Sequence, residues 1–185
     1  MKYLIIAILI ACAASCAPSL REMPAKDKVP AEYMHLEKRF KSKSAVEKID
    51  IAQTGAAFFY DGKLWTVKSA SDTYLAFEAR RFSNAEILIL DEPVPMTDMY
   101  KKMAQHHNMK DVKLLESEFV NVNNAVVIFN AMEGVVNRRE VSILGYGFSD
   151  AGRTVIAHCF IYKGMLRDET RQEIIEFLNG LAPKG

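Results

Sequence analysis

Methionine and histidine side chains that could bind a metal ion concentrate in one short segment. They are Met96, Met99, Met103, His106 and His107, with Met109 beyond them. Thioether and imidazole groups together suit Cu(I), and on a helix most of these residues share one stripe. An amphipathic helix needs an apolar stripe of this kind, however, and methionine fills gaps against a sheet well. We favour that core role. Met99, Met103, His106 and His107 are therefore candidate ligands only, and we expect no metal and no cofactor.

Residues that could act in catalysis occur in pairs whose geometry is unfavourable. Asp91 and Glu92 could form an acid–base pair or bind a hard cation, but neighbours in a strand point to opposite faces. His158 and Cys159 are also adjacent, so they are poorly placed as base and nucleophile. The chain has no Gly-x-Ser-x-Gly elbow, Cys-x-x-Cys pair or glycine-rich phosphate loop. We therefore expect a protein that is not an enzyme.

Aromatic side chains concentrate in the first predicted strands. They are Phe58, Phe59, Tyr60, Trp65, Tyr74 and Phe77. Such residues could line a pocket for an apolar ligand or form an exposed face for a partner, with Trp65 and Tyr74 as the candidates. Aromatic residues are also enriched in ordinary strands, so we favour a packed sheet core.

The elements that position these residues follow from the hydrophobic pattern. We predict strands at residues 58–60, 64–67, 73–79, 85–91, 112–122, 125–131, 141–148 and 154–162, and helices from about 98 to 107 and from 168 to 181. Asp61-Gly62 lies between the first two strands and predicts a hairpin with a type I′ turn. Gly145 and Gly147 lie within a strand, where glycine indicates a bulge or close packing.

Several predicted strands are apolar on both faces. Ile87 and Ile89 alternate with Leu88 and Leu90, and residues 126–129 are apolar throughout. Such strands need cover on both sides, which the two helices and the segment 31–50 can supply. Because the connections between strands are short, the sheet should be mostly antiparallel. We expect an α+β fold, a three-layer α-β-α sandwich with a central antiparallel sheet.

The chain begins with MKYLIIAILIACAASC, which has a basic residue, a short apolar run and small residues before a cysteine. This pattern is typical of a secretory signal that ends in a lipobox, and the run is too short to span a bilayer. Acylation is expected at Cys16, with Cys12 as the alternative; an ordinary secretory signal without lipid also remains open. Residues 1–15 would be the signal peptide. Ala17 after the cysteine favours the outer membrane if the source has one.

Residues 16–44 contain prolines and alternating charges, so we interpret them as a tether, followed by one globular domain over residues 45–185. A basic amphipathic turn on the membrane at residues 31–40, or a short helix packed on the domain, are alternatives within the tether. The formal net charge is +1, which gives no reason to expect nucleic acid. Cutting before Cys16 leaves Cys159 as a single thiol, expected to be buried.

Three stretches carry a resemblance to a known fold. They are Phe58 to Val67, Ala85 to Met103 and Ser149 to Leu181. Their order of hairpin, strand, helix and closing strand–helix resembles the PsbP/Mog-like superfamily, including the DcrB-like envelope lipoproteins. The resemblance implies an accessory or partner-binding role without catalysis, although a fold does not determine a function.

The sequence therefore predicts a non-enzymatic, lipid-anchored envelope protein that faces the periplasm and binds a protein partner. The expected partners are the membrane, through the N-terminal lipid, and an unidentified protein, with no nucleic acid. Two alternatives stay open. One is a carrier of a small apolar ligand or lipid in a pocket between sheet and helix. The other is a metal-binding or hydrolytic protein built on His106, His107 or Asp91.

Overall fold

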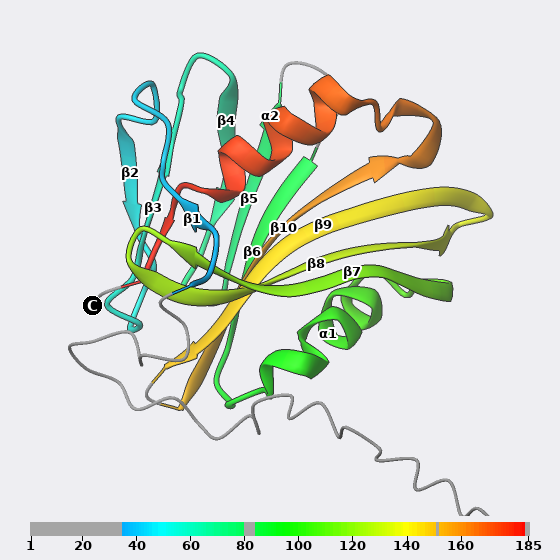
Figure 1. The fold of residues 1–185 in the computed structure, drawn as a ribbon, viewed down its shortest axis with the longest axis horizontal. Coiled ribbons are helices and arrows are strands. Elements are labelled where there is room, and N and C mark those ends of the chain that lie inside the picture. Colours follow the sequence, from blue (N-terminus) through cyan, green and yellow to red (C-terminus); the bar gives the residue numbers. More distant parts are fainter. Residues whose placement is uncertain (1–34, 80–83, 151, 184–185) are drawn as a thin grey trace, which may run out of the picture.

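The computed structural model describes residues 35–79, 84–150 and 152–183 (Figure 1). The predicted signal peptide, both candidate acylation sites and the tether up to residue 34 lie outside these residues. No helix within the described part of the chain is long and apolar enough to span a membrane.

Eight strands form the main sheet, in the order β1-β7-β8-β9-β10-β6-β5-β4. In chain order their bounds are β1 Lys38–Arg39, β4 Trp65–Ala70, β5 Tyr74–Ala79, β6 Asn84–Leu90, β7 Lys110–Val122, β8 Ala125–Val136, β9 Arg139–Asp150 and β10 Arg153–Tyr162. All neighbouring pairs are antiparallel except β1 and β7. The prediction of a mostly antiparallel sheet is confirmed.

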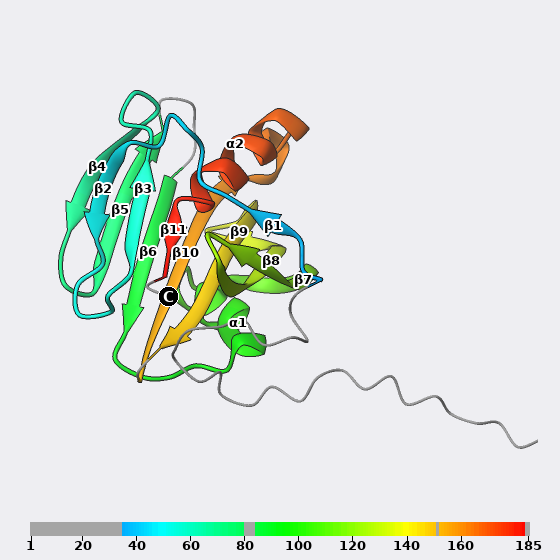
Figure 2. The same ribbon diagram turned by 60° about the vertical axis from the view of Figure 1, so that its left-hand side comes forward.

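Two helices lie on opposite sides of this sheet (Figures 1 and 2). Helix α1, Met99–His106, follows a 3-10 turn over Met96–Asp98, and helix α2, Asp168–Leu178, follows β10. A second sheet, in the order β11-β3-β2, lies beside α2; its strands are β2 Glu47–Asp50, β3 Ala57–Tyr60 and β11 Leu181–Ala182. The α+β fold is confirmed, and the layer that contains α2 also contains this small sheet.

The core has two parts, one on each face of the main sheet. The larger part joins the sheet to α2 and β3, through residues such as Phe77, Leu144, Phe58 and Phe177. The smaller part joins the other face to α1, through Ile128, Ile143, Ile156 and the α1 methionines. Burial of apolar side chains on both faces at about 25 cal/mol per Å² is the main force that holds the three layers together.

The predicted hairpin at Asp61-Gly62 is wrong. The two strands that flank this turn enter different sheets, because β3 pairs with β2 and β11 whereas β4 pairs with β5. Type I′-like backbone, with positive φ at two successive residues, occurs instead at Asn123-Asn124 between β7 and β8 and at Asn137-Arg138 between β8 and β9. Asparagine tolerates this left-handed region better than most residues do.

The N-terminal boundary of the domain also differs from the expected residue 45. Strand β1, at Lys38–Arg39, pairs with the end of β7, and Glu37 accepts a backbone hydrogen bond from Asn121. Arg39 contacts Glu37, Glu118 and the hydroxyl of Tyr146 at 2.8–3.0 Å. The last part of the predicted tether is therefore a strand of the sheet rather than a helix or a linker.

Candidate metal centre

Helix α1 packs closely against the main sheet because β9 carries glycine beneath it. A Cβ atom at Gly147 would lie 2.1 Å from Sδ of Met99, and one at Gly145 would lie 2.6 Å from Sδ of Met103. Both methionines are fully buried. The close packing expected at these two glycines is confirmed, and it fixes the height at which the end of α1 lies over the sheet.

Two polar side chains rise from the sheet beneath that end of α1. His158 on β10 is paired in register with Glu86 on β6, and with Gly145 on the other side. Directly paired residues project from the same face of a sheet. Their neighbours Ile156 and Leu88 belong to the core under α1, so this is the face that α1 covers.

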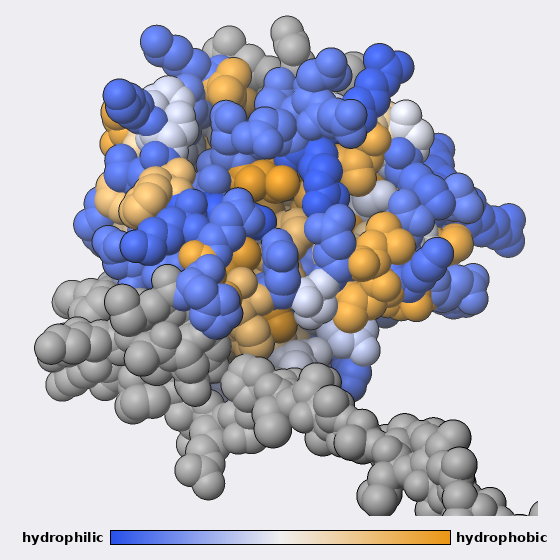
Figure 3. Space-filling view, in the orientation of Figure 1, coloured by the Kyte–Doolittle hydropathy of each residue, from blue (hydrophilic) through white to orange (hydrophobic). Residues whose placement is uncertain are grey.

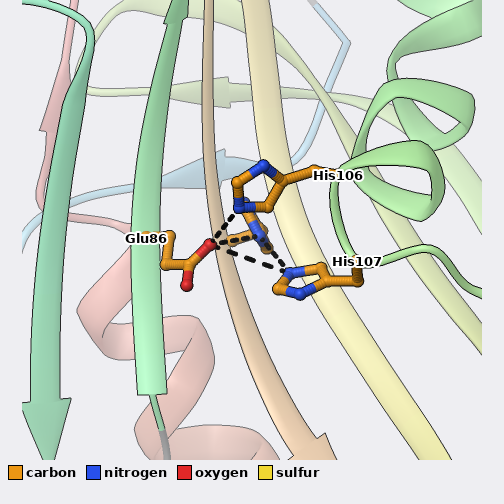
Figure 4. A group of neighbouring side chains, drawn as sticks. Glu86, His106 and His107 are labelled. Atoms are coloured by element: carbon orange, nitrogen blue, oxygen red, sulfur yellow. Dashed lines mark hydrogen bonds and ion pairs between the residues drawn. The ribbon is translucent and has the colours of Figure 1, made fainter. Parts of the chain in front are cut away.

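Two further side chains descend from the helix. His106 is the last residue of α1 and His107 is its C-cap, followed by Asn108 with a φ of 49°. The helix therefore stops where its two terminal imidazoles lie over β10 and β6. Figure 4 shows His106 and His107 directed toward Glu86, with the dashed contacts that join the group.

The four side chains form a compact group of three imidazoles and one carboxylate. Nε2 of His106 lies 2.7 Å from Oε2 of Glu86, and Nε2 of His107 lies 2.8 Å from Nε2 of His158. The same carboxylate oxygen lies 3.8 Å from Nε2 of His107 and 3.6 Å from Nε2 of His158. All potential ligand atoms lie within 4.8 Å of one another.

Exposure differs across this group, from the fully buried His158 to the partly exposed His106. The side chain of His158 is 0% exposed, those of His107 and Glu86 are 13% and 19% exposed, and that of His106 is 36% exposed. The group therefore has a closed floor and an open side at His106, through which a small ion can enter.

The electrostatics of the group favour neutral imidazole at its floor. Burial, together with the nearby imidazoles of His107 and His106, holds the pKa of His158 well below its ordinary value. Burial also lowers the pKa of His107, against the opposing charge of Glu86. Nδ1 of His158 is buried and makes no well-formed hydrogen bond with a described residue. A neutral imidazole has a free lone pair, which is the form that binds metal ions.

The donor set fits a divalent transition metal. Tetrahedral Zn²⁺ with ligand distances of about 2.1 Å places its ligand atoms about 3.4 Å apart. Separations of 2.7, 2.8, 3.6 and 3.8 Å bracket that value, and all four ligand atoms lie within 4.8 Å of one another. Rotations of the side chains would be needed to bring all four atoms to the tetrahedral spacing. Three imidazoles with only one carboxylate do not suit Ca²⁺ or Mg²⁺, which take oxygen ligands.

The structure separates the residues that the sequence grouped. His106 and His107 join the cluster, whereas Met99 and Met103 pack in the core with their sulfur atoms over the glycines of β9. Copper ligation through these thioethers therefore has no support from their packing. Cys159 belongs to the core on the other face, under α2.

The other candidates also lie apart from one another. Tyr74 lies beside the cluster, with its ring centroid 6.2 Å from that of His106, and burial and the Glu86 carboxylate raise its pKa to about 12. Trp65 lies on the opposite face, stacked on Phe177. Asp91 pairs with Arg153 at 2.9 Å and Glu92 with Lys102 at 2.6 Å, so these two carboxylates do not act together.

Sequence reasoning missed Glu86 and His158 as partners of the helix histidines. One signal was available, because Glu86 interrupts the apolar run of residues 85–90 and His158 interrupts that of residues 155–161. A charged or polar residue in a strand buried on both faces needs a partner.

Known proteins define the fold but not the family. No protein family and no curated protein matches the sequence. Solved structures do match. Cyanobacterial PsbP (CyanoP) from Synechocystis aligns with a TM-score of 0.53 and 14% identity over 77% of this chain and 95% of that one. The Ran-binding protein Mog1p of Saccharomyces cerevisiae aligns with a TM-score of 0.49 and 10% identity, over 71% and 84% of the two chains.

The match to PsbP shows that the chain has the fold that its sequence pattern predicted. At these identities the likeness shows the fold alone. The narrower resemblance to DcrB-like lipoproteins stays a prediction.

Proposed function

We propose that this protein binds a divalent transition-metal ion, with Zn²⁺ as the reference ion, through Glu86, His106, His107 and His158. The observation that carries the proposal is the convergence of three imidazole nitrogens and one carboxylate oxygen within 4.8 Å, from three separate elements of the fold. Imidazole suits zinc, copper, nickel and iron, so ions of this class are the expected ligands.

The ligand count favours binding over catalysis. Catalytic zinc sites keep an open coordination position for water or substrate, whereas sites with four protein ligands are closed. This group offers four ligand atoms. A reversible carrier or buffer of metal ions is therefore the function that the arrangement supports best, which agrees with the expectation of a protein without catalysis.

The experiment is a Zn²⁺ titration of the chelator-treated protein by calorimetry, compared with native mass spectrometry. We expect one ion per chain in the wild type. The H106A–H107A variant should lose it, because it removes two of the four ligands while leaving the buried floor of the site intact. The matched control is His35→Ala, since His35 is exposed and is the one histidine outside the group.

The two variants make the result unambiguous. Equal stoichiometry and affinity in the wild type and in H106A–H107A would reject the site, provided that circular dichroism shows both to be folded. A loss of binding in His35→Ala would instead place the ligand set elsewhere. Co²⁺ adds an independent readout, because its visible absorption distinguishes tetrahedral from octahedral coordination.

The proposal also includes the cellular location of the protein and its attachment to a membrane. A signal with a lipobox-like end supports export and acylation at Cys16, with the metal site then facing the periplasm. Labelling of cells with a radioactive or clickable palmitate should mark the wild type and spare Cys16→Ser. If Cys16→Ser is labelled and Cys12→Ser is not, Cys12 is the acylated residue. Absence of label from all three proteins would contradict the lipoprotein proposal.

Binding of a protein partner stays a prediction. It rests on the resemblance of fold, and related folds serve many unrelated functions. Crosslinking in intact cells, with the metal-binding variants beside the wild type, would show whether such a partner exists and whether it depends on the metal.

A further inference from the structure

A cavity of about 350 Å³ lies on the face of the molecule opposite the metal centre. It is bounded by one side of α2, the turn between β3 and β4, and the segment 42–45 that follows β1. The main sheet separates it from the histidine cluster, because Trp65 and Phe177 belong to the core under α2. The cavity and the metal centre are therefore independent sites.

Four aromatic side chains line this cavity. They are Phe59, Tyr60, Trp65 and Phe177. Trp65 and Phe177 form a stack with ring centroids 3.8 Å apart at its floor, whereas Phe59 and Tyr60 are only partly buried. Aromatic faces carry negative electrostatic potential, so a wall of this kind attracts organic cations as well as apolar groups.

The polar lining of the cavity is predominantly acidic. Asp61, Glu173 and Glu176 line it together with one base, Lys63. None of these four side chains forms an ion pair with a described residue. A second base, Lys41, lies against the wall, with its ammonium 4.8 Å from the ring centroid of Phe59 and donating to the carbonyl oxygen of Ala45. The carboxylate of Asp61 accepts a hydrogen bond from the backbone of Lys63, and that of Glu176 from Gln172. The three carboxylates thus outnumber the two nearby ammonium groups, and none of the three is held in an ion pair with a described residue.

The described residues on the side of the molecule shown in Figure 3 form no single broad apolar surface. Hydrophobic side chains form small groups between hydrophilic ones on this face. Broad exposed apolar patches are typical of protein interfaces. A cavity with an aromatic floor and a charged rim is instead the kind of site that small ligands occupy.

We propose that this cavity binds an organic cation, with an ammonium group near the acidic rim and its methyl or methylene groups against the aromatic floor. An anionic ligand would meet repulsion from Glu173 and Glu176. A neutral apolar ligand would gain the aromatic contacts but would leave the carboxylates without a counter-charge. The combination of rings and carboxylates thus selects the charge of the ligand.

The test uses the fluorescence of Trp65, which is the only tryptophan in the chain and lines the cavity. Choline is the probe, and 3,3-dimethylbutan-1-ol is its uncharged analogue of the same shape. We expect a saturable change with choline, and affinity for the alcohol lower by roughly threefold to thirtyfold, which is the range of a cation–π contact. Free tryptophan under the same conditions corrects for collisional quenching.

Substitutions on α2 test whether choline binds beside the acidic side chains of the cavity. E173Q–E176Q removes two of the three acidic charges of the rim and leaves that of Asp61. It should weaken the binding of choline at least about threefold, with little change in the binding of the alcohol. The matched control Glu169→Gln changes another exposed acid of α2 outside the cavity and should leave both affinities unchanged. All three positions are exposed, so the variants should fold, and circular dichroism checks this.

The outcomes separate this inference from the metal proposal. Equal binding of choline and the alcohol would overturn the selection of a cation and favour an apolar ligand. Absence of a saturable response to choline would overturn the site, and unchanged choline affinity in E173Q–E176Q would overturn the role of the rim. The H106A–H107A variant should bind choline like the wild type, so loss of the metal site does not affect the result.

Discussion

Sδ of Met103 lies over Gly145, 2.6 Å from the position that a Cβ atom would take at this glycine. The same Cβ would lie 2.8 Å from Cβ of His158 and 3.0 Å from the carbonyl oxygen of Ala157. One glycine thus determines both how closely α1 approaches the sheet and how much room His158 has in the metal centre.

Gly145→Ala should therefore destabilise the protein and distort the metal centre. Methionine can move its flexible end, but Cβ of His158 and a backbone oxygen cannot yield as easily. We expect a loss of about 1–3 kcal/mol in the free energy of unfolding, measured by urea denaturation. The control is Gly164→Ala, where a Cβ meets nothing within 4 Å. Equal stability of the two variants would contradict the close contact.

Gly147 also lies directly beneath α1, at a position where the contact with Met99 can be tested separately from the contacts at Gly145. The three atoms nearest to a Cβ at Gly147 would all belong to Met99, with the sulfur at 2.1 Å as the severe contact. Gly147→Ala should be destabilising alone. In a protein that already carries Met99→Ala, the added Gly147→Ala change should cost less, which a double-mutant cycle measures. Simple additivity of the two substitutions would show that the contact is not what makes alanine costly.

Binding of Zn²⁺ should stabilise the fold, because the ion would join α1 to β6 and β10. A ligand that binds only the native state at 100 times its Kd adds about 2.7 kcal/mol to the free energy of unfolding. The unfolding temperature in a thermal scan should rise accordingly with Zn²⁺. The H106A–H107A variant should not respond, whereas His35→Ala should respond like the wild type.

The metal-free protein should lose stability as the pH falls below about 6.5. The folded-state pKa of His158 lies well below its ordinary value because of burial, so the unfolded chain binds a proton that the folded chain rejects. Stability is then fully present above the ordinary histidine pKa and is lost below it. His107 acts in the same direction. Between pH 7.5 and 5.5 the loss for His158 should approach about 1 kcal/mol.

Urea denaturation in the presence of a chelator measures this dependence. His158→Asn should show a smaller change between pH 7.5 and 5.5, because the buried imidazole is gone, although its stability at pH 7.5 will be lower. His35→Ala should keep the wild-type slope. A wild-type protein more stable at pH 5.5 than at pH 7.5 would contradict the burial of a neutral His158.

Arg39 should contribute more to stability than its place near the N-terminal end of the described chain suggests. Its side chain is 12% exposed. The guanidinium contacts Glu37, Glu118 and the hydroxyl of Tyr146, and lies 5.2 Å from the ring centroid of Phe129. Arg39→Ala should cost about 1–3 kcal/mol in urea denaturation, since hydrogen bonds to charged groups are the stronger kind. Lys38→Ala, at an exposed position of the same strand, should cost much less.

Cys159 should be unreactive in the folded protein. It is fully buried, and burial raises the pKa of its thiol well above the ordinary value, so little thiolate forms near neutral pH. In a chain with Cys12 and Cys16 replaced by serine, labelling by a maleimide at pH 7.5 should be slow until urea unfolds the domain. Fast labelling without denaturant would show that the core under α2 opens readily.

Local pattern predicted much of the fold because hydrophobic periodicity is a property of neighbouring residues. The alternation of residues 155–161 places Cys159 under α2 and His158 under α1, and the apolar stripe of residues 98–107 identifies α1. The Asp61-Gly62 turn shows the limit of such reasoning. A turn sequence specifies a change of direction, but the sheet that each flanking strand joins depends on distant partners.

The sequence by itself determined the number and type of most elements, the need for cover on both faces of the sheet, and the presence of His106 and His107 at the end of a helix. Only the tertiary structure decided which side chains meet. Glu86 and His158 are 72 residues apart in the chain and become neighbours because β6 pairs with β10. Strand order is a choice among long-range pairings with similar local patterns. The metal centre therefore appears only when the whole sheet is assembled.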